Sequence, residues 1–143
     1  MARGILAGIL VTIVSLLFVP MQVVSWGVVI VTLLMTALLF SLAGLLNGVF
    51  AKNFDDVSII PTFILTPLTY LGGVFYSISL LPPVWQTISR FNPIVYMISG
   101  FRYGFLGAGD MALWISISVL AVFTSILFGL SYRLISKGRG LRT

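Results

Sequence analysis

The side chains that could do chemistry are few in this chain and far apart in its sequence. Its 143 residues include eight Lys and Arg and three acidic residues, with no His and no Cys. This inventory excludes imidazole bases, thiol nucleophiles, disulfides and most zinc sites. The G-x-x-x-x-G-K-[ST] loop that binds ATP phosphates is also missing. We therefore predict that the chain is not an enzyme, binds no cofactor itself and holds no metal.

Arg102 is the charged residue best placed for a functional role. It lies on a predicted short helix at membrane depth, where an ionisable side chain is costly unless it is paired or wetted. Asp110 or a lipid phosphate could neutralise it, and its long side chain could reach the outer headgroups. We expect a structural anchor, with contact to an anionic substrate as the alternative role. Arg90 is expected to be an interfacial anchor.

The composition indicates that a membrane protein positions these residues. Hydrophobic residues make up 59% of the chain and charged residues only 8%, and the mean hydropathy is +1.18. A soluble domain usually carries about a quarter charged residues, so the solvent of this chain is mostly lipid. The net charge of +5 comes from basic residues at the predicted membrane boundaries. That arrangement favours membrane lipid over nucleic acid as a partner.

Four segments are long and apolar enough to span a bilayer. Each has about 20 residues or more, which at about 1.5 Å per residue crosses roughly 30 Å of hydrocarbon. The segments are residues 5–24, 27–50, 57–81 and 111–135. We therefore predict an all-α membrane protein with a single domain over residues 1–143.

The basic residues favour an orientation with both termini in the cytoplasm, because inner loops carry the excess of Lys and Arg. In that orientation the inner loops and tails hold Arg3, Lys52, Arg133, Lys137, Arg139 and Arg142, and the outer side holds Arg90 and Arg102. Tryptophan prefers membrane interfaces. All three tryptophans then lie at or near the outer interface: Trp26, Trp85 and Trp114.

Residues 82–109 are too polar and too broken by prolines to form a fifth span. Pro82 stops the preceding helix, and Trp85 follows in a short amphipathic stretch. Asn92 and Pro93 are typical of an N-cap and a first helical position. A helix from there to about residue 106 would be roughly 21 Å long, which is too short to cross. We predict a re-entrant hairpin of two helices in the outer leaflet; the alternative is an ordinary surface loop.

The third predicted span contains the residues of a kinked or locally unwound helix. These are Pro61 and Pro67, followed by Gly72 and Gly73. In a transporter such a helix commonly lines the route, whereas a static bundle would merely tolerate it. We predict a helix that lines a translocation path. Its polar contacts would come from Thr66, Thr69 and Tyr70.

Glycines four residues apart let helix backbones approach closely in lipid. The three such pairs are Gly4/Gly8, Gly44/Gly48 and Gly100/Gly104. We expect only Gly44 and Gly48, in the middle of the second span, to form a packing face. Asn47 lies beside them and could form a hydrogen bond with a neighbouring helix.

Two acidic residues, Asp55 and Asp56, directly precede the third predicted span. Negative charge there is stabilised by the positive end of the helix dipole, so helix capping is the first interpretation. The second interpretation is that the loop 51–56, including Lys52, contacts an ATPase subunit.

Residues 65–105 resemble the C-terminal half of the permease subunits of bacterial ABC-2-type exporters. In that family a helix with proline and paired glycines leads to a Leu-Pro-x-Trp turn. An Asn-Pro segment with a downstream arginine then precedes the last spanning helix. The matching positions are Pro67, Gly72, Gly73, Leu81, Pro82, Trp85, Asn92, Pro93 and Arg102. The similarity is greatest to the branch of polysaccharide and drug exporters.

The resemblance implies a transmembrane permease subunit of an ATP-driven exporter in the bacterial inner membrane, forming part of the translocation path. A second permease copy would pair with it, and a separate ABC ATPase subunit would bind ATP beneath. A full permease of this family is longer, and this chain is expected to begin at its third span, without the main coupling loop. The alternative is a passive membrane assembly protein or a non-functional permease fragment.

Overall fold

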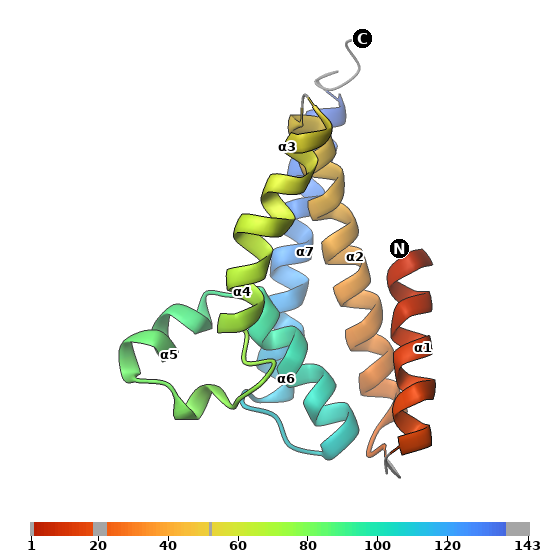
Figure 1. Cartoon of the computed structure of the whole chain (residues 1–143), viewed down its shortest axis with the longest axis vertical. Coiled ribbons are helices and arrows are strands. Elements are labelled where there is room, and N and C mark those ends of the chain that lie inside the picture. Colours follow the sequence, from red (N-terminus) through yellow and green to blue (C-terminus); the bar gives the residue numbers. More distant parts are fainter. Residues whose placement is uncertain (1, 19–22, 52, 137–143) are drawn as a thin grey trace.

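The computed structural model describes residues 2–18, 23–51 and 53–136 of the chain (Figure 1). All regular elements in these ranges are helical, which confirms the all-α prediction. In chain order they are α1 (Ala2–Phe18), α2 (Trp26–Phe50), α3 (Phe54–Ile59), the π-helical turn η1 (Ile60–Leu65), α4 (Thr66–Leu71), the 3₁₀ turn η2 (Ile78–Leu80), α5 (Pro83–Arg90), α6 (Pro93–Leu106) and α7 (Leu113–Ser136).

The two longest helices, α2 and α7, are long and apolar enough to cross a membrane. They pack against each other along the long dimension of the molecule, and α6 packs against both (Figure 1). α2 begins at Trp26 because Ser25 caps it: the Ser25 hydroxyl accepts a hydrogen bond from the Val28 N–H at 3.5 Å. These two helices match the predicted spans 27–50 and 111–135 closely.

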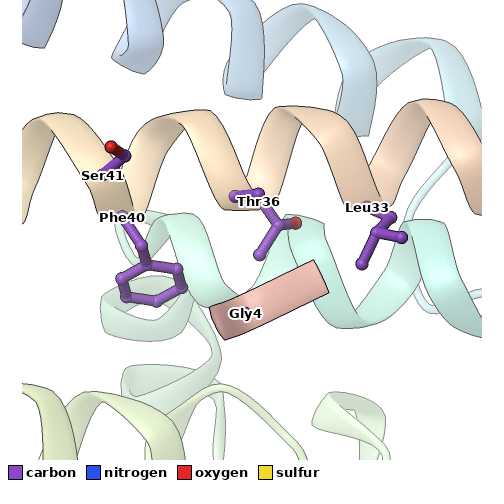
Figure 2. A pocket seen from close by; sticks show the side chains of 6 residues that line it. Gly4, Leu33, Thr36, Phe40 and Ser41 are labelled. Atoms are coloured by element: carbon purple, nitrogen blue, oxygen red, sulfur yellow. The ribbon is translucent and has the colours of Figure 1, made fainter. Parts of the chain in front are cut away.

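The first helix, α1, is shorter and packs against α2. It covers residues 5–18 of the predicted span 5–24, and residues 19–22 lie outside the described residues. Its 17 residues extend for about 25 Å. A cavity of about 270 Å³ lies between the two helices. Figure 2 shows Leu33, Thr36 and Phe40 of α2 beside Gly4 of α1.

The predicted span 57–81 is shorter than expected and is not one regular helix. Three elements, α3, η1 and α4, follow one another without a break from Phe54 to Leu71, so the helical course ends well before residue 81. The irregular part is the wider π-helical turn η1, which contains Pro61 and ends two residues before Pro67. Both prolines lack the N–H needed for α-helical hydrogen bonds.

The chain then forms the predicted pair of short helices, α5 and α6, in the lower half of Figure 1. α5 leads up from the lower edge to the level of α4, and α6 runs back down beside it. The α6 bounds agree with the sequence prediction, because Pro93 occupies its first turn and Gly107, with φ +75°, ends it. α6 is also the most buried helix. Four of the seven buried core residues belong to it: Ile94, Val95, Tyr96 and Met97. The other three are Leu39 of α2, Ile78 of η2 and Leu120 of α7.

Glycines of α6 allow this burial. A Cβ at Gly104 would lie 2.6 Å from Val29 Cγ2, and a Cβ at Gly100 would lie 2.9 Å from Thr32 Oγ1. The packing face predicted from the sequence is at Gly44 and Gly48, but a Cβ at either would meet nothing within 4 Å in the part of the chain that the structure describes. Within this chain, therefore, the close helix contact is made by the 100/104 pair. That Gly44 and Gly48 form a packing face stays a prediction, and such a face would have to contact another chain.

A matched pair of alanine substitutions tests this packing. We expect Gly104→Ala to lower the free energy of unfolding by about 1–3 kcal/mol, because the new methyl group overpacks the α2–α6 contact. Gly48→Ala should be neutral or stabilise by about 0.5–1 kcal/mol, because alanine is the better helix former and the space is open. The measurement is denaturation of the purified protein by sodium dodecyl sulfate in mixed micelles, followed by circular dichroism. Equal effects of the two substitutions would contradict the assignment.

Candidate functional site

The ends of three helices are joined by a polar network around Arg102, which we call the Arg102 network (Gly73, Ser77, Arg102 and Asp110). Arg102 Nη1 lies 2.8 Å from Asp110 Oδ2, and Arg102 Nη2 donates a hydrogen bond to the Gly73 carbonyl at 3.1 Å. Ser77 Oγ donates to Asp110 Oδ1. The Arg102 and Asp110 side chains are 25% and 15% exposed. Of the two partners considered for Arg102, Asp110 or a lipid phosphate, the structure shows Asp110.

The network ties together segments that are distant in sequence. Gly73 and Ser77 lie in the turn after α4, Arg102 lies on α6, and Asp110 lies in the connection from α6 to α7. One guanidinium group thus bridges both ends of the polypeptide segment that contains the α5–α6 hairpin. Such an arrangement can hold the adjoining ends of α4, α6 and α7 in register.

The paired glycines after α4 allow this bridge to form. Gly73 has φ +78°, a left-handed conformation that favours glycine, and its carbonyl meets Arg102. A Cβ at Gly72 would lie 2.7 Å from Ile94 Cγ2. The sequence predicts this pair within a kinked or locally unwound spanning helix. Here they instead end the helix and let α4 approach the first turn of α6.

Asn92 makes a second connection between α4 and α6. Its Oδ1 accepts a hydrogen bond from the Ile94 N–H at 3.0 Å, which is the predicted N-cap interaction. Its Nδ2 donates to the Leu68 carbonyl at 2.6 Å. That carbonyl lies in the last turn of α4, where backbone acceptors lack helical partners. The side chain is only 4% exposed, so Asn92 satisfies the ends of two helices at once.

Two serines that were not predicted from the sequence complete these connections. Ser77 belongs to the Arg102 network. Ser99 Oγ donates to the Met111 carbonyl at 3.1 Å and accepts from the Met111 N–H at 2.9 Å, which fixes α6 against the segment leading into α7. The sequence carries no signal for either serine, because their partners lie 33 and 12 residues away.

The polar residues predicted to line a path are mostly engaged within their own helix. Thr66 Oγ1 donates to the Pro61 carbonyl at 3.2 Å, and Thr69 Oγ1 donates to the Leu65 carbonyl at 2.7 Å. Tyr70 is 57% exposed. None of the residues of η1 or α4 is buried. The described chain therefore leaves this helical segment uncovered, and its role in a path stays a prediction.

The loop between α2 and α3 shows the capping that was the first interpretation of its acidic residues. The Asn53 N–H donates to Asp56 Oδ2 at 3.2 Å, and Asp55 lies exposed in the same first turn. Asn47 Nδ2 donates to the Val57 carbonyl at 3.0 Å, so it does bond to a neighbouring helix. Lys52 lies outside the described residues.

Comparison with known proteins decides the family. The family model described as ABC-2 type transporter matches residues 1–106. The chain belongs to the ABC-2 type transporter family. The match covers α1 to α6 and therefore includes Gly73, Asn92 and Arg102, the residues that connect α4 to α6. No solved structure matches this ABC-2 family chain.

Curated relatives include transport permeases. The chain is 65% identical over 142 residues to the inner membrane transport permease YadH of Escherichia coli strain K12, and the match covers 99% of this chain and 56% of that protein. The same identity and coverage are found with the permease of that name in Shigella flexneri. Nodulation protein J of Sinorhizobium fredii is 27% identical over 139 residues, which is 95% of this chain and 52% of that protein. The chain spans about half the length of the curated relatives it matches.

Proposed function

We propose that this chain is a transmembrane permease subunit of an ATP-driven ABC-2-type exporter and that it forms part of the translocation path in the bacterial inner membrane. The observation that carries the proposal is the family match over residues 1–106, together with the 65% identity to an inner membrane transport permease. The two long apolar helices agree with a membrane location. ATP hydrolysis is assigned to a separate subunit, because the sequence has no P-loop.

The proposed topology has four crossings with both termini in the cytoplasm. The crossings are α1, α2, the continuous α3–η1–α4 segment, and α7. The α5–α6 hairpin enters the outer leaflet and returns. The length of α6 supports this topology: the helix has 14 residues, or about 21 Å, and it packs against α2 and α7 in the lower half of the molecule (Figure 1).

The proposed partners bind at two places. An ABC ATPase subunit would contact the loop Ala51–Asp56, which joins α2 to α3 at the end of the molecule opposite the hairpin (Figure 1). A second permease copy would pair in the membrane around the path. The uncovered side of η1 and α4 and the open glycine face at Gly44 and Gly48 are surfaces available for that pairing.

Recovery of a partner ATPase tests the function. We expect the tagged chain, purified from gently solubilised native membranes, to bring down a P-loop ATPase that mass spectrometry identifies. The pair Asp55→Lys and Asp56→Lys, which reverses charge in the proposed contact loop, should reduce that recovery. An unrelated multi-pass protein with the same tag controls for adhesion to micelles. A chain that is recovered without an ATPase would favour the passive protein or permease fragment.

A further inference from the structure

α1 is only loosely packed against the rest of the molecule. None of residues 3–15, 17 and 18 is buried. The partly buried positions among them are three or four residues apart and therefore share one face of the helix: Ile5, Gly8, Thr12 and Ser15. Since α1 packs against α2, this face is the one turned toward α2. Three of its four residues are small or polar, so their side chains are too short to fill the space between the two helices.

α1 rests on α2 at Gly8. A Cβ at Gly8 would lie 3.2 Å from Leu33 Cδ1, whereas a Cβ at Gly4, one turn away, would meet nothing within 4 Å in the described part of the chain. The Thr12 hydroxyl donates to the Gly8 carbonyl at 2.8 Å, and such bonds to the preceding turn commonly bend a helix. Leu33 therefore supports α1 at a position where the helix can bend.

A cavity lies on each side of this contact. The Gly4 cavity has a volume of about 270 Å³ and the Trp26 cavity has one of about 630 Å³. The first, shown in Figure 2, is lined by Gly4, Leu33, Thr36, Ala37, Phe40 and Ser41. The second is lined by residues between Ala7 and Ile13 of α1, residues between Trp26 and Leu33 of α2, and Phe101 and Phe105 of α6. Leu33 lines both cavities, so α1 is supported at one place with open space on either side.

This support favours a tilting motion of α1. Protein interiors are close-packed, and side chains beside a void lose dispersion contacts with the atoms that are missing. Tilting α1 about Leu33 brings one end of the helix nearer to α2 and moves the other end away, so only one cavity can close at a time. The two arms are similar in length, because Gly4 and Ile13 lie four and five residues from Gly8, or about 6 Å and about 7.5 Å along the helix.

We propose that α1 rocks on Leu33 between two positions, one that closes the Gly4 cavity and one that closes the Trp26 cavity. In the second position α1 moves onto Phe101 of α6, which is the neighbour of Arg102 in the sequence. The position of α1 is thereby transmitted to the helix that holds the Arg102 network. This motion is a property of the chain itself and requires neither an ATPase nor a transported molecule.

Disulfide cross-linking measures the two positions, because the chain has no native cysteine. Gly4→Cys with Phe40→Cys spans the Gly4 cavity, and Ile13→Cys with Ile30→Cys spans the Trp26 cavity. Each pair should form a disulfide when the purified protein in lipid nanodiscs is oxidised with copper phenanthroline. With all four cysteines present, molecules that carry both disulfides should be at least about tenfold rarer than the product of the separate yields, because the two positions exclude each other. Gly4→Cys with Ile30→Cys is the control, and this pair should not cross-link.

Leu33→Ala tests the support itself. Without this side chain α1 can lie against α2 on both sides of Gly8, so both disulfides should form in the same molecule. Leu33→Met, which conserves the side-chain volume, should retain the exclusion. Independent formation of the two disulfides in the four-cysteine protein, or an exclusion that persists in Leu33→Ala, would overturn the proposal.

Ala37→Phe gives a second readout that leaves Leu33 in place. Its ring should fill the Gly4 cavity, so it should slow the cross-linking of positions 4 and 40 and accelerate that of positions 13 and 30. Leu45→Phe, at an exposed site of α2 that lines neither cavity, should change neither rate. A slower reaction at positions 4 and 40 with no change at positions 13 and 30 would show that α1 does not rock.

Discussion

Replacing Arg102 by alanine is expected to lower the free energy of unfolding by about 2 kcal/mol or more. The change removes two charge-assisted hydrogen bonds, one to Asp110 and one to the Gly73 carbonyl, and a hydrogen bond to a charged group contributes about 1.5–3 kcal/mol net to stability. Both side chains are mostly but not fully buried, so the loss should be smaller than for a dry interior pair. Denaturation in mixed micelles, followed by circular dichroism, measures it.

The double substitution distinguishes a true pair from two independent effects. Arg102→Ala with Asp110→Ala should cost about 1–2 kcal/mol less than the sum of the single changes, because neither charge is then left unpaired. Arg133→Ala is the control, since this exposed arginine has no ion-pair partner in the described ranges, and it should change stability by less than about 0.5 kcal/mol. Additive single effects would show that the ion pair contributes nothing.

Replacing Arg102 by alanine should also change hydrogen exchange in particular segments of the chain. The Arg102 network fixes the turn 73–77 and the connection 107–112, whereas α2 is held by packing with α6 and α7. Hydrogen exchange in Arg102→Ala should therefore accelerate in those two connections more than in α2, because local opening needs only the loss of polar contacts.

Helix positions could largely be predicted from the sequence, since hydropathy and capping act locally. The apolar runs predicted α2 and α7, and Asn92 with Pro93 predicted the start of α6. Local patterns also predicted that the helix containing Pro61 and Pro67 would be irregular. Its end at Leu71 was not predicted, because the apolar residues after Gly73 continue the hydropathy of a span while the backbone already turns.

Contacts between distant segments could not be predicted from the sequence, because they depend on how the helices pack. Gly44/Gly48 and Gly100/Gly104 show the same spacing, and only the burial of α6 against α2 makes the second pair the one that packs. The Arg102–Asp110 pair could be anticipated because the residues are close in sequence, whereas the Gly73 carbonyl and Ser77 lie 29 and 25 residues before Arg102. Nothing local specifies a serine as the partner of an aspartate so far along the chain.

Replacing Asn92 by alanine is expected to have the largest effect of the single changes, about 2–4 kcal/mol of lost unfolding free energy. Loss of the N-cap accounts for about 1 kcal/mol. Loss of the Nδ2 donor leaves the partly buried Leu68 carbonyl without its partner, which costs about 1–3 kcal/mol. The micelle denaturation assay that measures Arg102→Ala applies here without change.

Asn92→Ser separates the two contributions of Asn92. A serine hydroxyl can still accept the hydrogen bond from the Ile94 N–H, but it is too short to reach the Leu68 carbonyl. It should therefore recover only the capping part, about 1 kcal/mol relative to alanine. Thr87→Ala is the control, because that exposed hydroxyl bonds only to the Pro83 carbonyl of its own helix. If serine restored full stability, the connection between α4 and α6 would contribute nothing. If alanine and serine were equally destabilising, the cap would not matter and the α4 contact would carry the whole effect.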